Sequence, residues 1–452
     1  DQRVQGGQGS FAEGPEVIFM VQPSGDRERD IGLEVFYSDT AGSGGKLKAE
    51  PEDFVVDEVS KYPPAKPEGK VCVARVTATN WETNRLVRHM SKALGISRNR
   101  IGFAGTKDKR AVTAQLMSFE APVEEVMSLR LSQVMVEQGY MAKRGMTIGD
   151  LVGNNFRIRV RETRLRGGDL RDSLQGTEEA LRSLNGFPNY FGVQRFGTVR
   201  PVTHLVGRAI VKGDLEAAVL LYIGNPSEEE DERSRAAREA LQRDRDYTAA
   251  LRDFPHKLTF ERMVIGFLER NPGDFAGAIC VLPTNLQMMF VHAYQSYLFN
   301  LMLSERMRRG MPLNAPSVGD IVLPADRDGN PDHDKPVPVT GTNIDLVERQ
   351  VRDRRAFISA TLFGSESVLA EGEMGKIERQ AIQREGLRPE DFLVPAIPHC
   401  SSRGSRRELI CEYRDLRLDV GEDEYTASFF LGKGCYATVL LREFMKSDMD
   451  EY

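Results

Sequence analysis

The sequence has few of the residues that mark secreted, metal-binding or membrane proteins. Its five cysteines (Cys72, Cys280, Cys400, Cys411 and Cys435) include no Cys-X-X-Cys pair, and their odd number argues against a complete disulfide framework. The six histidines lack the spacing of metal ligands, so we predict no metal site. No stretch approaches the ~18 consecutive apolar residues that a membrane span needs. These absences predict a soluble protein of a reducing cytoplasm.

Positive charge is not in excess, because the formal net charge is −6. Whole-chain charge is nevertheless a weak test of nucleic-acid binding, since phosphates need only a local basic surface. Tryptophan is limited to Trp81, which argues against the aromatic cleft of an enzyme that hydrolyses sugar polymers. The length of 452 residues predicts two or three domains of roughly 150 residues each. The polar, glycine-rich start predicts a flexible N-terminal segment over residues 1–30.

A basic amphipathic helix is predicted over residues 83–94. Apolar residues recur there at helical spacing, Thr83 is a plausible N-cap, and Gly95 follows the last turn. The opposite face is basic, and more cations follow it, so we expect a positively charged surface that leads into residue 101. With two later cations, our candidates for contact with nucleic acid are Arg85, Arg88, Lys92, Arg98, Arg100, Lys107 and Arg195.

Arginine alternates strictly with apolar residues in the segment NFRIRVR, residues 155–161, which predicts a strand with one buried face. The other face is a row of guanidinium groups. Two interpretations stay open: a solvated or salt-bridged sheet face, and a face turned toward RNA. Further along, residues 228–246 predict an exposed helix, and residues 285–309 predict a long helix with a buried stripe that includes Met288.

Residues 101–115, IGFAGTKDKRAVTAQ, place one carboxylate, Asp108, among three cations. Gly102 and Gly105 stand too close together for a phosphate-binding P-loop, and Asp108 occupies the position of its hydroxyl residue. An aspartate beside cations is ordinarily a surface ion pair. The same cations favour an ionised carboxylate, however, and a nucleophile or base for glycosyl chemistry must be ionised.

Residues 189–197, NYFGVQRFG, combine three aromatic rings with Asn189, Gln194 and Arg195. This composition offers a flat surface for stacking a nucleobase, amides for its edge, and a cation for phosphate. An aromatic turn in the protein core has a similar composition, so both interpretations stay open.

Four separated segments, taken in this order, resemble the motif series of the TruD family of tRNA pseudouridine synthases. The resemblance implies an α+β fold: a pseudouridine synthase catalytic domain with a mixed, largely antiparallel sheet, and an inserted, smaller α+β domain. The longer start and the enlarged stretch at residues 200–280 resemble archaeal and eukaryotic members. The segments are KLKAEPEDFVVDEV (46–59), GFAGTKDKRAVTAQ (102–115), NYFGVQRFG (189–197) and GCYATVLLREF (434–444).

By the same resemblance the catalytic domain is discontinuous, over residues 31–214 and 396–452, and the insert covers residues 215–395. The family's catalytic aspartate falls on Asp108. Phe191 matches the phenylalanine that replaces the active-site tyrosine of other pseudouridine synthases. The remaining residues expected to line the uridine pocket are Lys48, Phe54, Asn189 and Arg442, and Arg442 is expected to pair with the catalytic carboxylate by analogy with other synthase families.

The activity that the resemblance implies is isomerisation of a uridine in tRNA, expected at uridine 13, to pseudouridine, without a cofactor. Asp108 could attack C1′, add to the uracil ring or abstract a sugar proton, and the sequence does not choose among these. A non-catalytic RNA-binding protein or RNA chaperone on the same fold is the alternative, and a carboxylate-dependent glycoside hydrolase is a third hypothesis. No protein partner is implied, and the oligomeric state stays open, with a monomer favoured.

Overall fold

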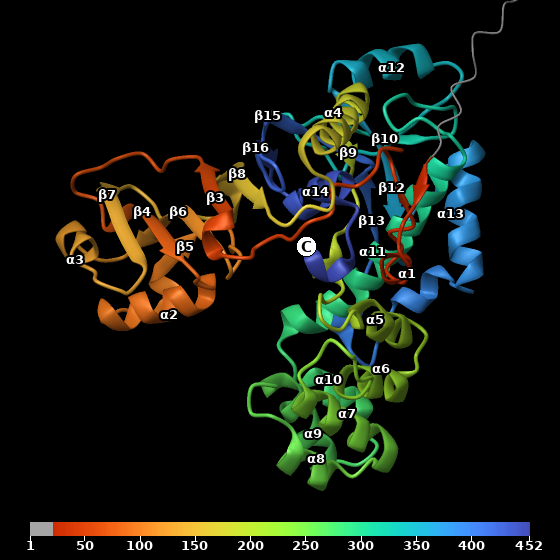
Figure 1. The fold of residues 1–452 in the computed structure, drawn as a ribbon. Coiled ribbons are helices and arrows are strands. Elements are labelled where there is room, and N and C mark those ends of the chain that lie inside the picture. The colour runs from red at the N-terminus through yellow and green to blue at the C-terminus, as the bar shows by residue number, and fades with distance from the viewer. Residues whose placement is uncertain (1–20) are drawn as a thin grey trace, which may run out of the picture.

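The computed structural model describes residues 21–452 and has an α+β fold (Figure 1). Its larger sheet has eight strands in the order β15-β16-β8-β3-β6-β4-β7, with β5 paired to β6. Every pair in this sheet is antiparallel except β3 with β6. The predicted fold class is therefore confirmed. The strands are β3 (Phe54–Ser60), β4 (Val71–Thr79), β5 (Ile101–Phe103), β6 (Val112–Phe119), β7 (Val134–Ala142), β8 (Leu151–Val160), β15 (Tyr413–Val420) and β16 (Tyr425–Gly432).

Two groups of helices cover the same face of this sheet. The basic helix predicted near residue 83 is α2 (Thr83–Ala93), and its apolar side packs on β4 and β6. At the other end, α14 (Ala437–Met445) and α4 (Gly167–Leu184) pack on β8 and β16 in the main core. Figure 1 shows α2 beneath the orange part of the sheet and α14 beside β16.

A helical region follows the first part of the sheet and leads into a second, smaller sheet. Figure 1 shows α5 to α10 gathered on one side of the molecule, joined to the rest by the long α11. The smaller sheet is antiparallel throughout, in the order β11-β10-β12-β13. Its last strand, β13, comes from the predicted catalytic segment rather than from the predicted insert; the domain boundaries themselves stay a prediction. The helices are α5 (Thr203–Val211), α6 (Leu215–Ile223), α7 (Glu232–Asp244), α8 (Tyr247–Asp253), α9 (Thr259–Arg270), α10 (Phe275–Cys280) and α11 (Thr284–Arg308).

The elements that surround the smaller sheet, and the short elements elsewhere, complete the chain. The first group is β10 (Ile321–Pro324), β11 (Val337–Pro338), α12 (Ile344–Arg352), β12 (Ala356–Leu362), α13 (Gly372–Arg384) and β13 (Ser405–Glu408). The short elements are β1 (Gln22–Pro23), α1 (Asp26–Arg29), β2 (Val35–Phe36), α3 (Val123–Met127), β9 (Phe187–Pro188) and β14 (Ile410–Cys411).

The beginning of the described chain is tied to its end. Glu28 of α1 is buried and accepts two hydrogen bonds from Arg442 of α14, at 2.7 and 3.0 Å. The prediction of a flexible segment over residues 1–30 is therefore wrong for residues 21–30, because a buried ion pair fixes them. Residues 1–20 lie outside the described residues.

Two patterns read from the sequence have clear outcomes. Arg161, just after β8, donates to both carboxylate oxygens of Asp53, at 2.9 and 2.8 Å, and Arg159 on β8 lies 3.8 Å from Glu424. The salt-bridged interpretation of this strand is thus confirmed for these two arginines. The long helix α11 is mostly buried as predicted, but Met288, which the predicted stripe included, is exposed.

One disulfide joins Cys411 at the end of β14 to Cys435 just before α14. Cys72, Cys280 and Cys400 are free thiols. Cysteine spacing did not indicate this bond, since the two residues are 24 positions apart and meet only because the β15–β16 hairpin returns the chain. Among residues 21–452, no helix has both the length and the apolar composition that crossing a membrane requires.

Candidate active site

Asp108 lies on the loop between β5 and β6, and both sides of this loop are anchored. The backbone N–H of Lys107 donates to Thr83 Oγ1 at 2.8 Å, and Arg110 donates to the carbonyl of Ala49 at 2.6 Å. The Lys107 side chain turns inward and forms an ion pair with the buried carboxylate of Glu58. Asp108 itself is left with about half of its side chain exposed, at 49%. The fold therefore holds the backbone rigidly and presents this carboxylate outward.

Lys48 is the cation that meets Asp108. Its Nζ lies 3.3 Å from Asp108 Oδ2 and 4.3 Å from the centroid of the Phe54 ring. Phe54 is buried at the start of β3, and its ring contacts Phe156 of β8 with centroids 6.2 Å apart. Lys48 has a φ of +54°, a left-handed conformation that is unfavourable for a lysine. The structure thus brings together three predicted residues, Lys48, Phe54 and Asp108, which we call the Asp108 cluster.

Two predicted site residues lie elsewhere. Arg442 is almost fully buried and pairs with Glu28 instead of Asp108, so the predicted pairing with the catalytic carboxylate is wrong. Although burial disfavours its charge, Glu28 holds the pKa of Arg442 above its usual value. Lys107 is also wrong as a contact for RNA, because its ammonium group is buried against Glu58. Lys107 was predicted as one of several cations and Arg442 by analogy with other synthase families, and neither argument shows where a side chain points.

Both atoms of the Asn189 side-chain amide form hydrogen bonds within the protein. Its Nδ2 donates to the carbonyl and to Oε1 of Glu408, both at 3.0 Å. Its Oδ1 accepts a hydrogen bond of 2.5 Å from Arg407. Because the amide nitrogen donates twice and Oδ1 accepts from Arg407, Asn189 positions its neighbours in this structure and has no unused donor for a base edge.

Phe191 lies next to Asn189 and is covered by Arg407, whose guanidinium carbon is 4.3 Å from the ring centroid. Asn300 fixes the backbone of Phe191 by accepting from its N–H at 2.9 Å and donating to its carbonyl at 3.1 Å. Arg195 approaches the same ring at 5.6 Å. Burial lowers the pKa of both arginines. We call Asn189, Phe191 and Arg407 the Phe191 cluster.

Arg407 was not predicted from the sequence. It lies on β13, 218 residues from Asn189, in a segment whose composition resembles any charged surface strand. It reaches Phe191 because the chain after β13 continues into β14, which pairs with β9 just before the NYFGVQRFG segment. No signal within the sequence could have paired them.

The register of the large sheet relates the two clusters. Glu58, which binds Lys107, pairs with Asn154 of β8, and Asn154 pairs in turn with Leu431 of β16. Side chains of directly paired residues point to the same face, and three neighbouring strands span roughly 10 Å. The chain then continues from Leu431 to the carbonyl of Gly434, which accepts a hydrogen bond of 3.3 Å from the Phe191 cluster. The two clusters therefore approach β8 from opposite sides of one sheet face.

The remaining predicted cations lie on or beside α2. Arg85 lies over the ring of Trp81 at 5.4 Å, and Arg100 pairs with Glu120 at 3.0 Å. All five cations of this group are exposed to solvent, as contact with phosphate requires. The exposed cations are Arg85, Arg88, Lys92, Arg98 and Arg100.

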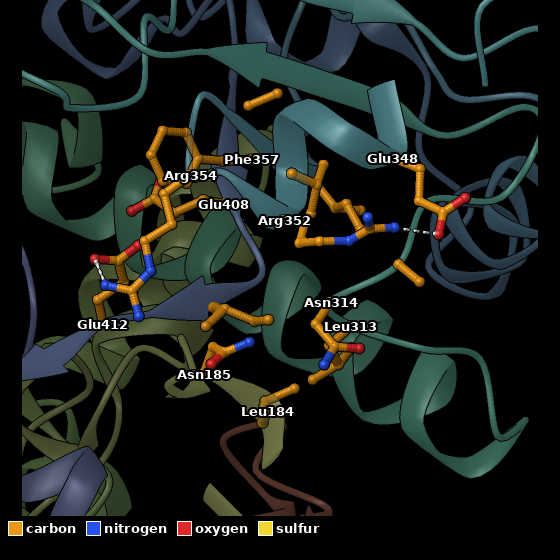
Figure 2. Close-up of a pocket in the computed structure, with 15 residues that line it drawn as sticks. Leu184, Asn185, Leu313, Asn314, Glu348, Arg352, Arg354, Phe357, Glu408 and Glu412 are labelled. Atoms are coloured by element: carbon orange, nitrogen blue, oxygen red, sulfur yellow. Dashed lines mark hydrogen bonds and ion pairs between the residues drawn. The ribbon is translucent and has the colours of Figure 1, made fainter. Parts of the chain in front are cut away.

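A cavity of about 290 Å³ opens near Glu408 but is separate from both clusters (Figure 2). Figure 2 shows four of its charged side chains in two pairs: Arg352 with Glu348, and Arg354 with Glu412. Because no member of the Asp108 cluster lines it, we assign it no catalytic role. In the described part of the chain, no three His, Cys, Asp or Glu side chains are grouped so as to hold a metal ion.

The arrangement can be compared with known proteins. A family model described as tRNA pseudouridine synthase D (TruD) matches residues 30–444. This chain belongs to the TruD family. Relatives carrying the name "Probable tRNA pseudouridine synthase D" include that of Methanosarcina barkeri, 39% identical over 429 residues, with 93% of this chain and 98% of the relative covered. That of Thermoplasma acidophilum is 38% identical over 399 residues, with 88% and 93% covered.

A solved structure agrees with the family assignment. The crystal structure of the TruD protein from Methanosarcina mazei matches with a TM-score of 0.84 at 38% identity, and the match covers 95% of this chain and 100% of that one. The predicted family and enzyme class, an isomerase of the pseudouridine synthase type, are thereby confirmed. The roles of single residues in this TruD protein stay predictions.

Proposed function

We propose that this TruD protein isomerises a uridine of tRNA to pseudouridine, with Asp108 as the catalytic carboxylate. The observation that carries the proposal is the contrast between the anchored loop and the exposed carboxylate: Lys107 and Arg110 are both engaged, while Asp108 faces outward with Lys48 at 3.3 Å. The name shared by the family and the relatives, tRNA pseudouridine synthase D, supports tRNA as the substrate.

The reaction needs no external reactant. The bond between N1 of uracil and C1′ breaks, the base turns while bound, and C5 bonds to C1′. The hydrogen on C5 leaves as a proton, and N1 gains one, so atoms and electrons balance. Asp108 either attacks C1′, adds to the ring or abstracts a sugar proton, and each route begins with a carboxylate that the Lys48 ammonium orients.

The target uridine has to leave its stack before any of these steps. The exposed cations of α2 support this, because a basic surface beside the Asp108 loop can hold RNA phosphates while one nucleotide is extruded. The proposal includes uridine 13 as the position and the cytoplasm as the place of action. The three free thiols fit a reducing compartment, whereas the Cys411–Cys435 disulfide is of a kind that is rare in one.

The test is pseudouridine mapping on unmodified tRNA transcripts, incubated with the wild type or Asp108→Asn and without added cofactor. The proposal expects conversion at uridine 13 by the wild type, and none by the variant although it still binds tRNA. Conversion elsewhere would refute the position but keep the chemistry. Binding without conversion would favour the RNA-binding or chaperone alternative, and release of free uracil would favour a hydrolase.

A further inference from the structure

Asn154 stands on β8, the strand that both clusters approach, and its amide oxygen is unused. This Oδ1 is buried and receives no hydrogen bond from any residue in 21–452. A buried acceptor without a donor costs free energy, so such groups in native proteins have a reason. The unpaired oxygen of Asn154 therefore needs an explanation.

The register shows which way Asn154 points. It is two residues before Phe156, so the two side chains share a face of β8. Phe156 contacts Phe54, the ring beneath the Lys48 ammonium. The cross-strand partner of Asn154 is Glu58, which binds Lys107, the residue before the catalytic carboxylate. Asn154 therefore lies on the face that carries the Asp108 cluster.

The other asparagine of the site, Asn189, already uses both atoms of its side-chain amide. The Asn189 amide gives both hydrogens to Glu408 and takes one from Arg407. Reading a base with it would break contacts that hold Arg407 over Phe191. The Asn154 oxygen has no hydrogen bond to lose, so Asn154 can bind a base edge at a lower cost than Asn189 can.

The edge of uracil presents one donor, N3–H, between two carbonyl acceptors, O2 and O4. A carboxamide offers one acceptor oxygen and a donor nitrogen side by side, which matches two adjacent groups of that edge. We infer that Asn154 is the residue that recognises the uracil edge, with Oδ1 accepting from N3–H and Nδ2 donating to a ring carbonyl. This inference rests on the proposed function and adds a specificity-determining residue to it.

The test compares Asn154→Ala with Asn155→Ala. Asn155 is the matched control, because it is exposed and points to the opposite face of the same strand. Each protein is given tRNA in which the target is either uridine or 3-methyluridine, which lacks the N3 hydrogen. We expect Asn154→Ala to lower kcat/KM on uridine by roughly 10- to 100-fold, the effect of losing hydrogen bonds to a buried group. The methyl group should lower wild-type activity by a similar factor, and that of Asn154→Ala by less than about threefold.

Asn154→Asp serves as a second variant of the same size; it keeps an acceptor for N3–H but replaces the donor, so it should lose activity on uridine as well. Equal conversion of uridine by the wild type, Asn154→Ala and Asn155→Ala would overturn the inference. So would an Asn154→Ala protein that loses activity but still suffers the full penalty from the methyl group, because that result shows a purely structural role. If the wild type and Asn155→Ala convert no uridine, the proposed function itself fails.

Discussion

The Nζ of Lys48 lies 3.3 Å from Oδ2 of Asp108, although 60 residues separate them along the chain. The lysine is only 17% exposed, whereas the carboxylate is half exposed, so the cation supports the carboxylate from the protein side and leaves its outer face to the substrate. Lys48 is thus the cation beside Asp108, the position that analogy with other synthase families had assigned to Arg442. Its geometry makes Lys48 the first residue to change.

Lys48→Met should lower kcat by roughly 100-fold, because it keeps the side-chain length over Phe54 but removes the preorganised charge beside the carboxylate. The matched control is Lys46→Met, since Lys46 lies two residues before Lys48 and forms an exposed ion pair with Glu162. Single-turnover kinetics with bound tRNA measures the chemical step. Equal rate losses in both variants would show that a general loss of positive charge, not this contact, matters.

Arg407→Ala and Asn189→Ala should each lower kcat/KM, and the double variant should be no worse than the more damaged single one. The reason is that Asn189 Oδ1 holds the guanidinium over Phe191, so either change releases the same contact. A double-mutant cycle measures the coupling, which we expect at about 1–3 kcal/mol. Arg403→Ala is the control, because that side chain is 83% exposed. Additive losses would contradict the positioning role of Asn189.

Arg442→Met should destabilise the protein by about 3–5 kcal/mol, because it leaves the Glu28 carboxylate buried without its partner. Changing both residues, to Arg442→Met with Glu28→Leu, should restore part of the free energy of unfolding. Chemical denaturation followed by circular dichroism measures both. The folded fraction should keep its kcat, and a large loss of kcat with normal stability would return Arg442 to the catalytic site.

The free energy of unfolding should fall as the pH drops from about 6.5 to about 4 because of His204. Burial lowers its pKa to about 4, whereas an unfolded histidine has a pKa of about 6.5, so protons bind the unfolded chain first. The loss can reach about 3 kcal/mol at the acid end. His204→Phe fits between Phe196 and Tyr297 and should show a shallower pH dependence. Parallel curves for the two proteins would refute this assignment.

Periodic patterns predicted the local structure well because local physics determines it. The apolar spacing of α2 and the strict alternation on β8 follow directly from the helix and strand repeats. The four motifs also led to Asp108, Lys48 and Phe54, which the fold does bring together. These are the features that a single sequence contains.

Features that depend on distant parts of the chain could not be predicted in the same way. Arg407 contacts Phe191 because β14, which follows β13 in the chain, pairs with β9. Cys411 meets Cys435 because the β15–β16 hairpin lies between them. The predicted role of Arg442 was wrong because a motif position does not determine which residue a side chain contacts. Nothing in the sequence near α14 indicates that its partner is a buried carboxylate on α1. Asn154 could not be predicted because the pattern of β8 indicates only which residues are buried, not which amide lacks a hydrogen-bond partner.

The most direct measurement of the central claim is release of tritium from tRNA labelled at C5 of uridine. Formation of the C5–C1′ bond expels that hydrogen, whereas binding and hydrolysis of the glycosidic bond retain it. Wild-type protein should release tritium without any cofactor, Asp108→Asn should release none while binding tRNA as tightly, and no free uracil should appear. Tritium release by Asp108→Asn at the wild-type rate would contradict the account, because the carboxylate would then play no part in the chemistry.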